Sequence, residues 1–288
     1  MNIEKAQLLA NQFSSFQFRV FKTSPSVKKG YNQKKTSGNG EVFWQYREYT
    51  SDDTIQEIDW KRSGRGDRLI VREREKEGTQ DIWLWRSTSP SMKFYSGITS
   101  ARKEELTELI ILALGIIFIN SGGSISFLGS SRLPKKGKNG LNNLTESLGT
   151  QNPHSEIPYE AGISQHCELI ILSDFLASPE QYEVTVKKIA QNGCRGVFVQ
   201  ILDPAEETFP FNGKITFKDM EGFQSRSVHR AEEIREGYLA QLAIHRRNLI
   251  KTLDSIGWRF LNFTTETGAE EILHTILKQL ILSRNLAR

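Results

Sequence analysis

The amino-acid sequence predicts a doubly wound α/β protein with a mainly parallel sheet, and two observations support this. From residue 81 onward, apolar segments that suit strands alternate with segments that have the length and periodicity of helices. The strand candidates are rich in Ile, Val, Leu and Phe without strict alternation, as in strands that helices cover on both faces. We therefore expect residues 81–288 to form one α/β domain.

The elements of this domain are expected in a fixed order. The predicted strands are residues 82–86, 124–128, 168–172, 196–202 and 258–263. The predicted helices are residues 103–120, 179–191, 230–255 and 269–285. A loop is expected between the second strand and residue 158, and a β-rich excursion over residues 209–228.

Two segments precede this domain. Residues 1–40 are expected to form an N-terminal helix over 2–21 and a flexible basic connector. Residues 41–80 form a charged segment with two short strands, 43–48 and 68–75. The lysines between Lys28 and Lys35 carry a weaker hypothesis of nucleic-acid binding. We do not expect it, because no aromatic side chains alternate with them as in a single-strand groove.

The composition is that of an ordinary globular protein, with 38% hydrophobic and 25% charged residues. No secretory signal is recognisable at the N-terminus. The most apolar stretch, residues 109–119, is shorter than the roughly 20 residues that cross a bilayer, so we expect no membrane span. Cys167 and Cys194 precede strand candidates and are expected to be buried thiols in a reducing compartment. We expect a cytoplasmic protein.

A hydroxyl-rich loop follows the strand predicted at residues 82–86. Ser87, Ser89 and Ser91 stand at alternate positions and could point at one centre, where their oxygens suit a hard cation. A Mg²⁺ site also needs a carboxylate, which Asp174 could supply from the end of a neighbouring strand. The alternative is a hydroxyl-rich turn, with Asp174 acting as a helix cap.

The charged segment is the second candidate site, with ten acidic and eight basic residues in 41–80 and several aromatic residues among them. Arginine pairs bidentately with carboxylates, so the segment could be a buried ion-pair lattice or a surface that a partner recognises. The residues selected for this role are Arg47, Asp53, Asp59, Trp60, Arg62, Arg72 and Glu73.

Motifs of catalysis are missing from the sequence. It contains no GxxxxGK[ST] phosphate loop, no HExxH pair and no GxSxG nucleophile turn. The sequence therefore favours a binding or assembly role over an enzyme, and no small-molecule substrate is evident.

Several spaced motifs together resemble the domain of unknown function 58 family over nearly the whole chain. They are GEVFWQYREY at 40–49, DD at 52–53, IDWKRS at 58–63, VRERE at 71–75, ILSDFL at 171–176, ILDPAEE at 201–207 and FPF at 209–211. The resemblance implies a bacterial cytoplasmic protein with a domain similar to the von Willebrand factor type A fold. It also implies a MoxR-type AAA+ ATPase, commonly encoded beside such proteins, as the partner in assembling or activating client proteins.

The type A fold carries a cation motif of the form Asp-x-Ser-x-Ser, and this sequence departs from it. Ser87 stands in place of the leading aspartate, Ser89 and Ser91 match the serines, and Asp174 matches the later acidic position. Losing that carboxylate is expected to lower metal affinity steeply. We thus expect a non-enzymatic interaction factor with no cofactor. The alternative is a binder or hydrolase that depends on a divalent metal ion, with Mg²⁺ as the candidate, at the degenerate serine loop.

Overall fold

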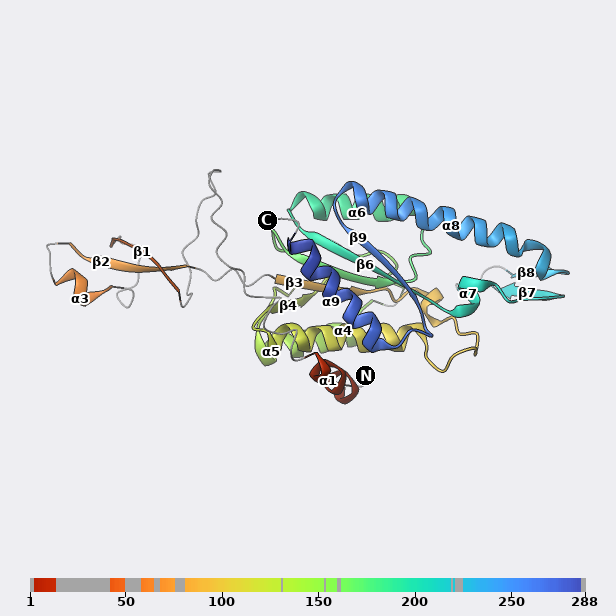
Figure 1. Ribbon diagram of the computed structural model, residues 1–288, viewed down its shortest axis with the longest axis horizontal. Coiled ribbons are helices and arrows are strands. Elements are labelled where there is room, and N and C mark those ends of the chain that lie inside the picture. Colours follow the sequence, from red (N-terminus) through yellow and green to blue (C-terminus); the bar gives the residue numbers. More distant parts are fainter. Residues whose placement is uncertain are drawn as a thin grey trace. The chain divides into compact units, whose positions relative to one another are not determined.

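The computed structural model of the chain (Figure 1) divides into two compact units, residues 1–21 with 80–288, and residues 22–79. The larger unit holds the predicted α/β domain, and the smaller unit holds the charged segment. The structure describes residues 3–13, 42–49, 58–64, 68–75, 81–130, 132–152, 154–159, 162–218, 220 and 225–285.

The larger unit is built on a sheet of five parallel strands in the order β4-β3-β5-β6-β9. Because the chain moves from β3 outward to β4 and then back across β3 to β5, the sheet is doubly wound. This confirms the predicted fold class, a mainly parallel sheet similar to the type A fold. The strands are β3 (Asp81–Arg86), β4 (Ser124–Phe127), β5 (Glu168–Ser173), β6 (Arg195–Leu202) and β9 (Arg259–Thr264).

Helices cover both faces of this sheet (Figure 1). One face carries α6 (Pro179–Gln191) and α8 (Ala231–Ser255), and the other carries α4 (Lys103–Asn120), α5 (Gly137–Thr150) and α9 (Ala269–Asn285). Two short helices, η3 (Pro90–Lys93) and α7 (Pro204–Thr208), follow the carboxyl ends of β3 and β6. The four helices predicted within residues 81–288 are confirmed within one residue at each end.

The helix α4 is apolar on all sides because protein surrounds it. It lies against the sheet, and α1 (Ile3–Gln12), α5 and α9 pack on its other sides. The α1 residues Ala6 and Ala10 are fully buried in the same core. The N-terminal helix thus joins the α/β core, and the rest of the helix predicted over 2–21 lies outside the described residues. The boundaries expected at residues 40 and 80 stay predictions.

The helix α5 corrects the loop that we expected between β4 and residue 158. Gly140 of α5 has a packing role, since a Cβ there would lie 2.2 Å from the carbonyl oxygen of Lys135. Gly115 of α4 likewise makes room for Leu144 of α5, whose Cδ2 would lie 2.4 Å from an added Cβ. Gly140 thus leaves space for a backbone carbonyl, and Gly115 leaves space for a side chain of the neighbouring helix.

Two antiparallel strand pairs complete the described structure. The pair β7 (Ile215–Lys218) and β8 (Ser225–Val228) confirms the β-rich excursion. In the smaller unit, β1 (Val42–Glu48) pairs with β2 (Ile70–Glu75), and the four-residue helix α3 (Trp60–Ser63) lies between them in the sequence. Among the described residues, every helix is too short or too polar to cross a bilayer.

Candidate functional site

The serine loop, residues 87–91, leaves the sheet at the carboxyl end of β3. The Oγ atoms of Ser87 and Ser89 lie 3.0 Å apart, and those of Ser89 and Ser91 lie 2.7 Å apart. Ser87 and Ser89 are buried. The structure therefore brings the three predicted hydroxyls together as one hydrogen-bonded chain.

Groups of the protein itself satisfy these hydroxyls. The Ser87 hydroxyl accepts a hydrogen bond from the backbone N–H of Ser89 at 3.1 Å and lies 3.2 Å from the carbonyl oxygen of Ser155. The neighbouring Thr88 hydroxyl donates to the carbonyl oxygen of Asn152 at 2.8 Å. These contacts correspond to the alternative that the sequence left open, in which the hydroxyls hold a turn together.

Asp174, which follows β5 directly, is buried and pairs with a lysine that the sequence did not single out. Its Oδ2 accepts a hydrogen bond from Nζ of Lys103 at 3.2 Å. The same Nζ donates to both carboxylate oxygens of Glu206, at 2.6 and 2.8 Å. Lys103 is 0% exposed, and Asp174 is 1% exposed. Two carboxylates from different strand ends thus share one buried ammonium, and we call these three residues the lysine centre.

Burying the Lys103 ammonium at this position would cost free energy if these two carboxylates were missing. Lys103 is the first residue of α4, where the positive end of the helix dipole disfavours a cation. A buried ammonium must also recover the hydration that it loses, which requires close carboxylates and good hydrogen bonds. The Phe94 ring, 5.7 Å from Nζ, adds a cation–π contact. The geometry of Asp174 and Glu206 is therefore what allows a lysine at this site.

Glu206 is held in place by the backbone as well as by Lys103. It is the third residue of α7, and its Oε2 accepts the N–H of Asp203 at 2.7 Å, while the Asp203 carboxylate caps the same helix. The second Asp203 oxygen accepts the N–H of Ser96 at 3.0 Å, which ties α7 to the loop before α4. Burial raises the pKa of Glu206 above its ordinary value, and the nearby Lys103 opposes that rise.

The lysine centre fits an internal ammonium, because both carboxylates contact Nζ of Lys103. Mg²⁺ needs oxygen ligands that include a carboxylate, and the predicted carboxylate, Asp174, is paired with Lys103. In the part of the chain that the structure describes, no three His, Cys, Asp or Glu side chains are grouped so that they could hold a metal. A Mg²⁺ site at Ser87, Ser89, Ser91 and Asp174 stays a prediction, and it would require Lys103 to move away.

A second polar network lies behind the lysine centre. The Gln200 side chain on β6 donates to the carbonyl oxygen of Asp174 at 2.7 Å and accepts from Nε of Arg246 at 2.8 Å. Arg246, on α8, also binds Glu207 through two hydrogen bonds of 3.0 and 2.6 Å. Tyr238, about two helical turns before Arg246 on α8, donates to the carbonyl oxygen of Glu206 at 2.8 Å. The network fixes α8 against the strand ends that carry the centre.

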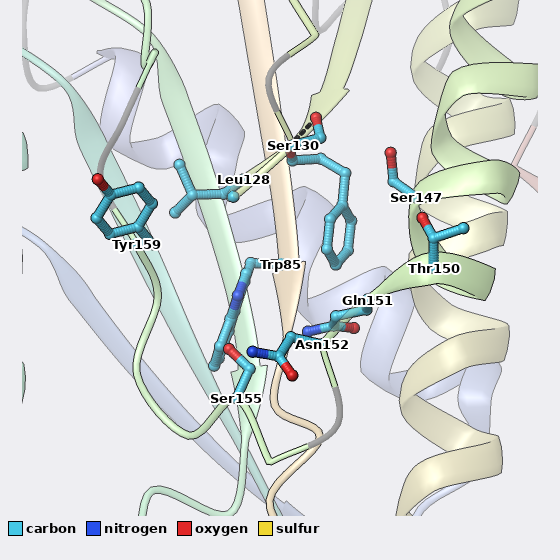
Figure 2. A pocket seen from close by; sticks show the side chains of 11 residues that line it. Trp85, Leu128, Ser130, Ser147, Thr150, Gln151, Asn152, Ser155 and Tyr159 are labelled. Atoms are coloured by element: carbon cyan, nitrogen blue, oxygen red, sulfur yellow. Dashed lines mark hydrogen bonds between the residues drawn. The ribbon is translucent and has the colours of Figure 1, made fainter.

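A pocket of about 400 Å³ lies beside the serine loop, and Figure 2 shows its walls. Ser155, whose backbone contacts Ser87, lines it together with Trp85 and Gln151. The Gln151 amide donates to the carbonyl oxygen of Arg86 at 2.6 Å. The other lining residues are Phe127, Leu128, Gly129, Ser130, Ser147, Thr150, Asn152 and Tyr159. All of these residues carry uncharged side chains.

The charged segment is described only in part. Asp59 caps α3 by accepting the N–H of Arg62 at 3.1 Å, and Trp60 and Arg62 are exposed, with Trp60 at 61%. Within β1 and β2 the backbone of Arg72 is opposite Tyr46, and that of Glu73 is opposite Gln45. The side chains of Arg47, Arg72 and Glu73, and all of Asp53, lie outside the described residues. The choice between a buried lattice and an interface stays open for those positions.

Lys103 and Glu206 are the site residues that the sequence analysis missed. A lysine followed by Glu104 and Glu105 reads as the exposed start of a helix. One signal could have identified Lys103. Acidic side chains are preferred in the first turn of a helix, so a lysine at the first position indicates a carboxylate partner elsewhere in the fold. Glu206 belongs to the ILDPAEE motif at 201–207, but the motif alone assigned it no role.

Comparison with protein families agrees with the motifs. A family model described as "Protein of unknown function DUF58" matches residues 45–248, which is more than two thirds of the chain. The chain belongs to the DUF58 family. The match includes the second part of β1, the serine loop, the lysine centre and most of α8. The resemblance that the sequence motifs indicated is thereby confirmed at the level of the family.

Curated relatives extend the comparison but name no activity. An uncharacterized protein of Mycobacterium bovis and one of Mycobacterium tuberculosis are each 22% identical to this DUF58 protein over 249 residues. The aligned region covers 80% of this chain and 76% of each relative.

Two solved structures share parts of the architecture. One is an aerotolerance-related membrane protein from Bacteroides fragilis with multiple mutations to serines, with a TM-score of 0.42 and 9% identity. The other is the conserved hypothetical protein BatB from Bacteroides thetaiotaomicron, with a TM-score of 0.37 and 12% identity. Each match covers 70% of this chain and 98% of the other. The fold assignment rests on the strand order of the sheet and not on these two likenesses.

Proposed function

We propose that this DUF58 protein is a non-enzymatic interaction factor of the bacterial cytoplasm that acts with a MoxR-type AAA+ ATPase to assemble or activate client proteins. The observation that carries the proposal is the lysine centre. At the end of the sheet where α/β proteins place their reactive groups, both buried carboxylates are bound to Lys103. Both carboxylates are therefore engaged by a cation that the chain itself supplies.

The loops around the lysine centre offer contacts of a different kind. Tyr95 and Ile98 follow η3 and are 39% and 51% exposed, and Leu176, two residues after Asp174, is 41% exposed. We call these three residues the apolar rim. The guanidinium of Arg102 lies 4.9 Å from the centre of the Tyr95 ring and supports it. Aromatic and aliphatic side chains on a rigid base are suited to anchor a protein partner.

The lysine centre makes this rim independent of metal. In a site with a divalent cation, a partner carboxylate could complete the coordination, but here the ammonium is 0% exposed and already paired. Recognition therefore depends on the apolar rim and its backbone, with the buried ion pairs holding the strand ends together beneath it. Nucleic acid and small molecules are not part of the proposal.

A binding measurement with the purified MoxR-type ATPase of the same genome tests the proposal. The full chain is immobilised, and binding is measured with Mg²⁺ and with a chelator. Ile98→Asp and Leu176→Asp place charge on the rim and are expected to weaken binding by about tenfold or more, which corresponds to about 1.4 kcal/mol. The chelator is expected to have no effect on the nucleotide-free complex.

Val184→Asp is the matched control, because Val184 is 58% exposed on α6 and lies outside the rim. It is expected to bind like the parent. Failure of the ATPase to bind the parent chain at all would contradict the partnership. Binding that survives both rim substitutions would show that the interface lies elsewhere.

A further inference from the structure

The two cysteines of the chain lie next to each other at the amino ends of two central strands. Cys167 immediately precedes β5, and Cys194 immediately precedes β6. The register pairs Glu168 with Arg195, so the two cysteines are the next pair outward, and the N–H of Arg195 donates to the carbonyl oxygen of Cys167 at 2.9 Å. They belong to the edge of the sheet opposite the lysine centre.

The backbone geometry at this position suits a disulfide. Neighbouring strands lie about 4.7–4.9 Å apart, which falls inside the Cα–Cα range of about 4.4–6.8 Å that disulfides span. The two Sγ atoms are already 2.7 Å apart. Because a disulfide bond is about 2.05 Å long, only a small further approach is needed and no strand has to slide.

The two thiols differ in their surroundings. Cys167 is 0% exposed, and its thiol donates to Sγ of Cys194. Cys194 is 4% exposed, and its Sγ lies 3.1 Å from the carbonyl oxygen of Ser164. The hydrogen bond from Cys167 lowers the pKa of Cys194, whereas the same bond and burial raise the pKa of Cys167. Cys194 is therefore the sulfur that loses its proton more readily and stands nearer to solvent.

The segments before the two cysteines are short surface turns. His166 and Gly193 are exposed and have positive φ values of 54° and 73°. The two turns meet, since the N–H of His166 donates to the carbonyl oxygen of Asn192 at 3.0 Å. Opening of these turns would expose Cys194 without disturbing the sheet, because turns at the ends of strands open at low free energy.

We propose that Cys167 and Cys194 are a reversible oxidation site that a hydroperoxide converts to an intramolecular disulfide. The Cys194 thiolate attacks one peroxide oxygen and becomes a sulfenic acid, and the hydroxide released takes up the proton that the thiol lost. The Cys167 sulfur then attacks Sγ of Cys194, and its proton leaves with the hydroxyl group as water. Two thiols lose two electrons, hydrogen peroxide becomes two waters, and a thiol reductant reverses the bond.

The bond would link the amino ends of β5 and β6 and close the chain segment that contains α6. A cross-link of this kind restricts the unfolded chain, so the oxidised protein is expected to melt at a higher temperature than the reduced protein. The lysine centre at the other end of the same strands is expected to keep its structure. Oxidation would thus change the stability of the larger unit without altering the proposed interface.

The test uses the full chain, reduced and then freed of reductant, with hydrogen peroxide as the probe. We expect the loss of both titratable thiols, a monomer on a non-reducing gel and a mass lower by two hydrogen atoms. Peptide mapping without reduction is expected to give a single linked pair that contains residues 167 and 194. Retention of both thiols would overturn the proposal, and so would products that are only intermolecular dimers or oxygen adducts.

Single variants test the order of the two steps. Cys167→Ser is expected to accumulate a sulfenic acid on Cys194 that dimedone labels, and Cys194→Ser is expected to leave Cys167 unlabelled at the same peroxide dose. Equal labelling of the two variants would overturn the assignment of Cys194 as the attacking sulfur. The mass measurement on the parent chain does not depend on how well either variant folds.

Discussion

Two regions of this protein carry charged candidate sites, and the parts of them that the structure describes use charge differently. In the larger unit, Lys103, Asp174 and Glu206 form an ion-paired centre that solvent barely reaches. In the described part of the smaller unit, Asp59 caps a short surface helix, and Arg62 is exposed beside it. Among the described residues, the buried ion pair thus lies outside the segment with the highest density of charged residues.

The lysine centre shows that a buried ion pair can form where the sequence has no high density of charge. Asp174 and Glu206 lie 71 and 103 residues after Lys103 in the chain, and only the parallel sheet brings the three residues together. A buried charge is stable only where its partner is fixed by the fold. Neighbours in a charged segment can instead satisfy one another, or water, at the surface.

The largest effect is expected from Lys103→Met, which leaves two buried carboxylates without their cation. Breaking a buried ion pair by removing one partner costs about 3–5 kcal/mol, so the free energy of unfolding should fall by about that amount. Chemical denaturation of the larger unit measures it. Lys138→Met is the matched control, since Lys138 is exposed on α5, and its effect is expected to stay within about 0.5 kcal/mol.

The combined variant Lys103→Met, Asp174→Asn, Glu206→Gln sharpens this result. Because it removes the charges as a set, it is expected to be more stable than Lys103→Met alone. If the single Lys103→Met substitution melts like the Lys138→Met control, the lysine centre does not hold the strand ends together.

A smaller effect is expected in the charged segment. Asp59→Ala removes the cap of α3, which costs about 0.5–2 kcal/mol at a helix N-terminus, whereas Asp59→Asn keeps an acceptor and should cost less. Hydrogen exchange of the Arg62 amide measures the change, because that N–H donates to Asp59. A loss as large as that of Lys103→Met would mean that Asp59 has a buried partner after all, and the contrast between the two regions would fail.

The sequence predicted most of the fold because its signals are local. Strand and helix periodicities placed β3, α4, β5 and α6 to within one or two residues. The helix α5 was missed because the space that Gly140 leaves for the Lys135 carbonyl oxygen is seen only in the folded chain. The lysine centre was missed for the same reason, since its members meet only in three dimensions. Asp174 was found because it follows a recognisable strand, but its partner could not be.

The smallest effect is expected in the pH dependence of stability. Burial raises the pKa of Glu206 above its ordinary 4.5, so the folded state binds its proton more tightly than the unfolded state. The parent should therefore lose stability relative to Glu206→Gln as the pH rises from about 4.5 through that raised pKa, and the difference should be constant above it. Denaturation of both proteins across this range measures the difference. If the parent instead gains stability relative to Glu206→Gln as the pH rises, attraction to Lys103 outweighs burial.

The central claim is that Lys103 takes the place of a divalent cation at the carboxyl end of the sheet. Titration calorimetry of the full chain with Mg²⁺ and Mn²⁺ tests it most directly, with Asp174→Asn as the reference. The parent is expected to give no saturable heat at millimolar metal and an unchanged melting temperature. Saturable binding to the parent that Asp174→Asn abolishes would contradict the claim and restore the serine loop as a metal site.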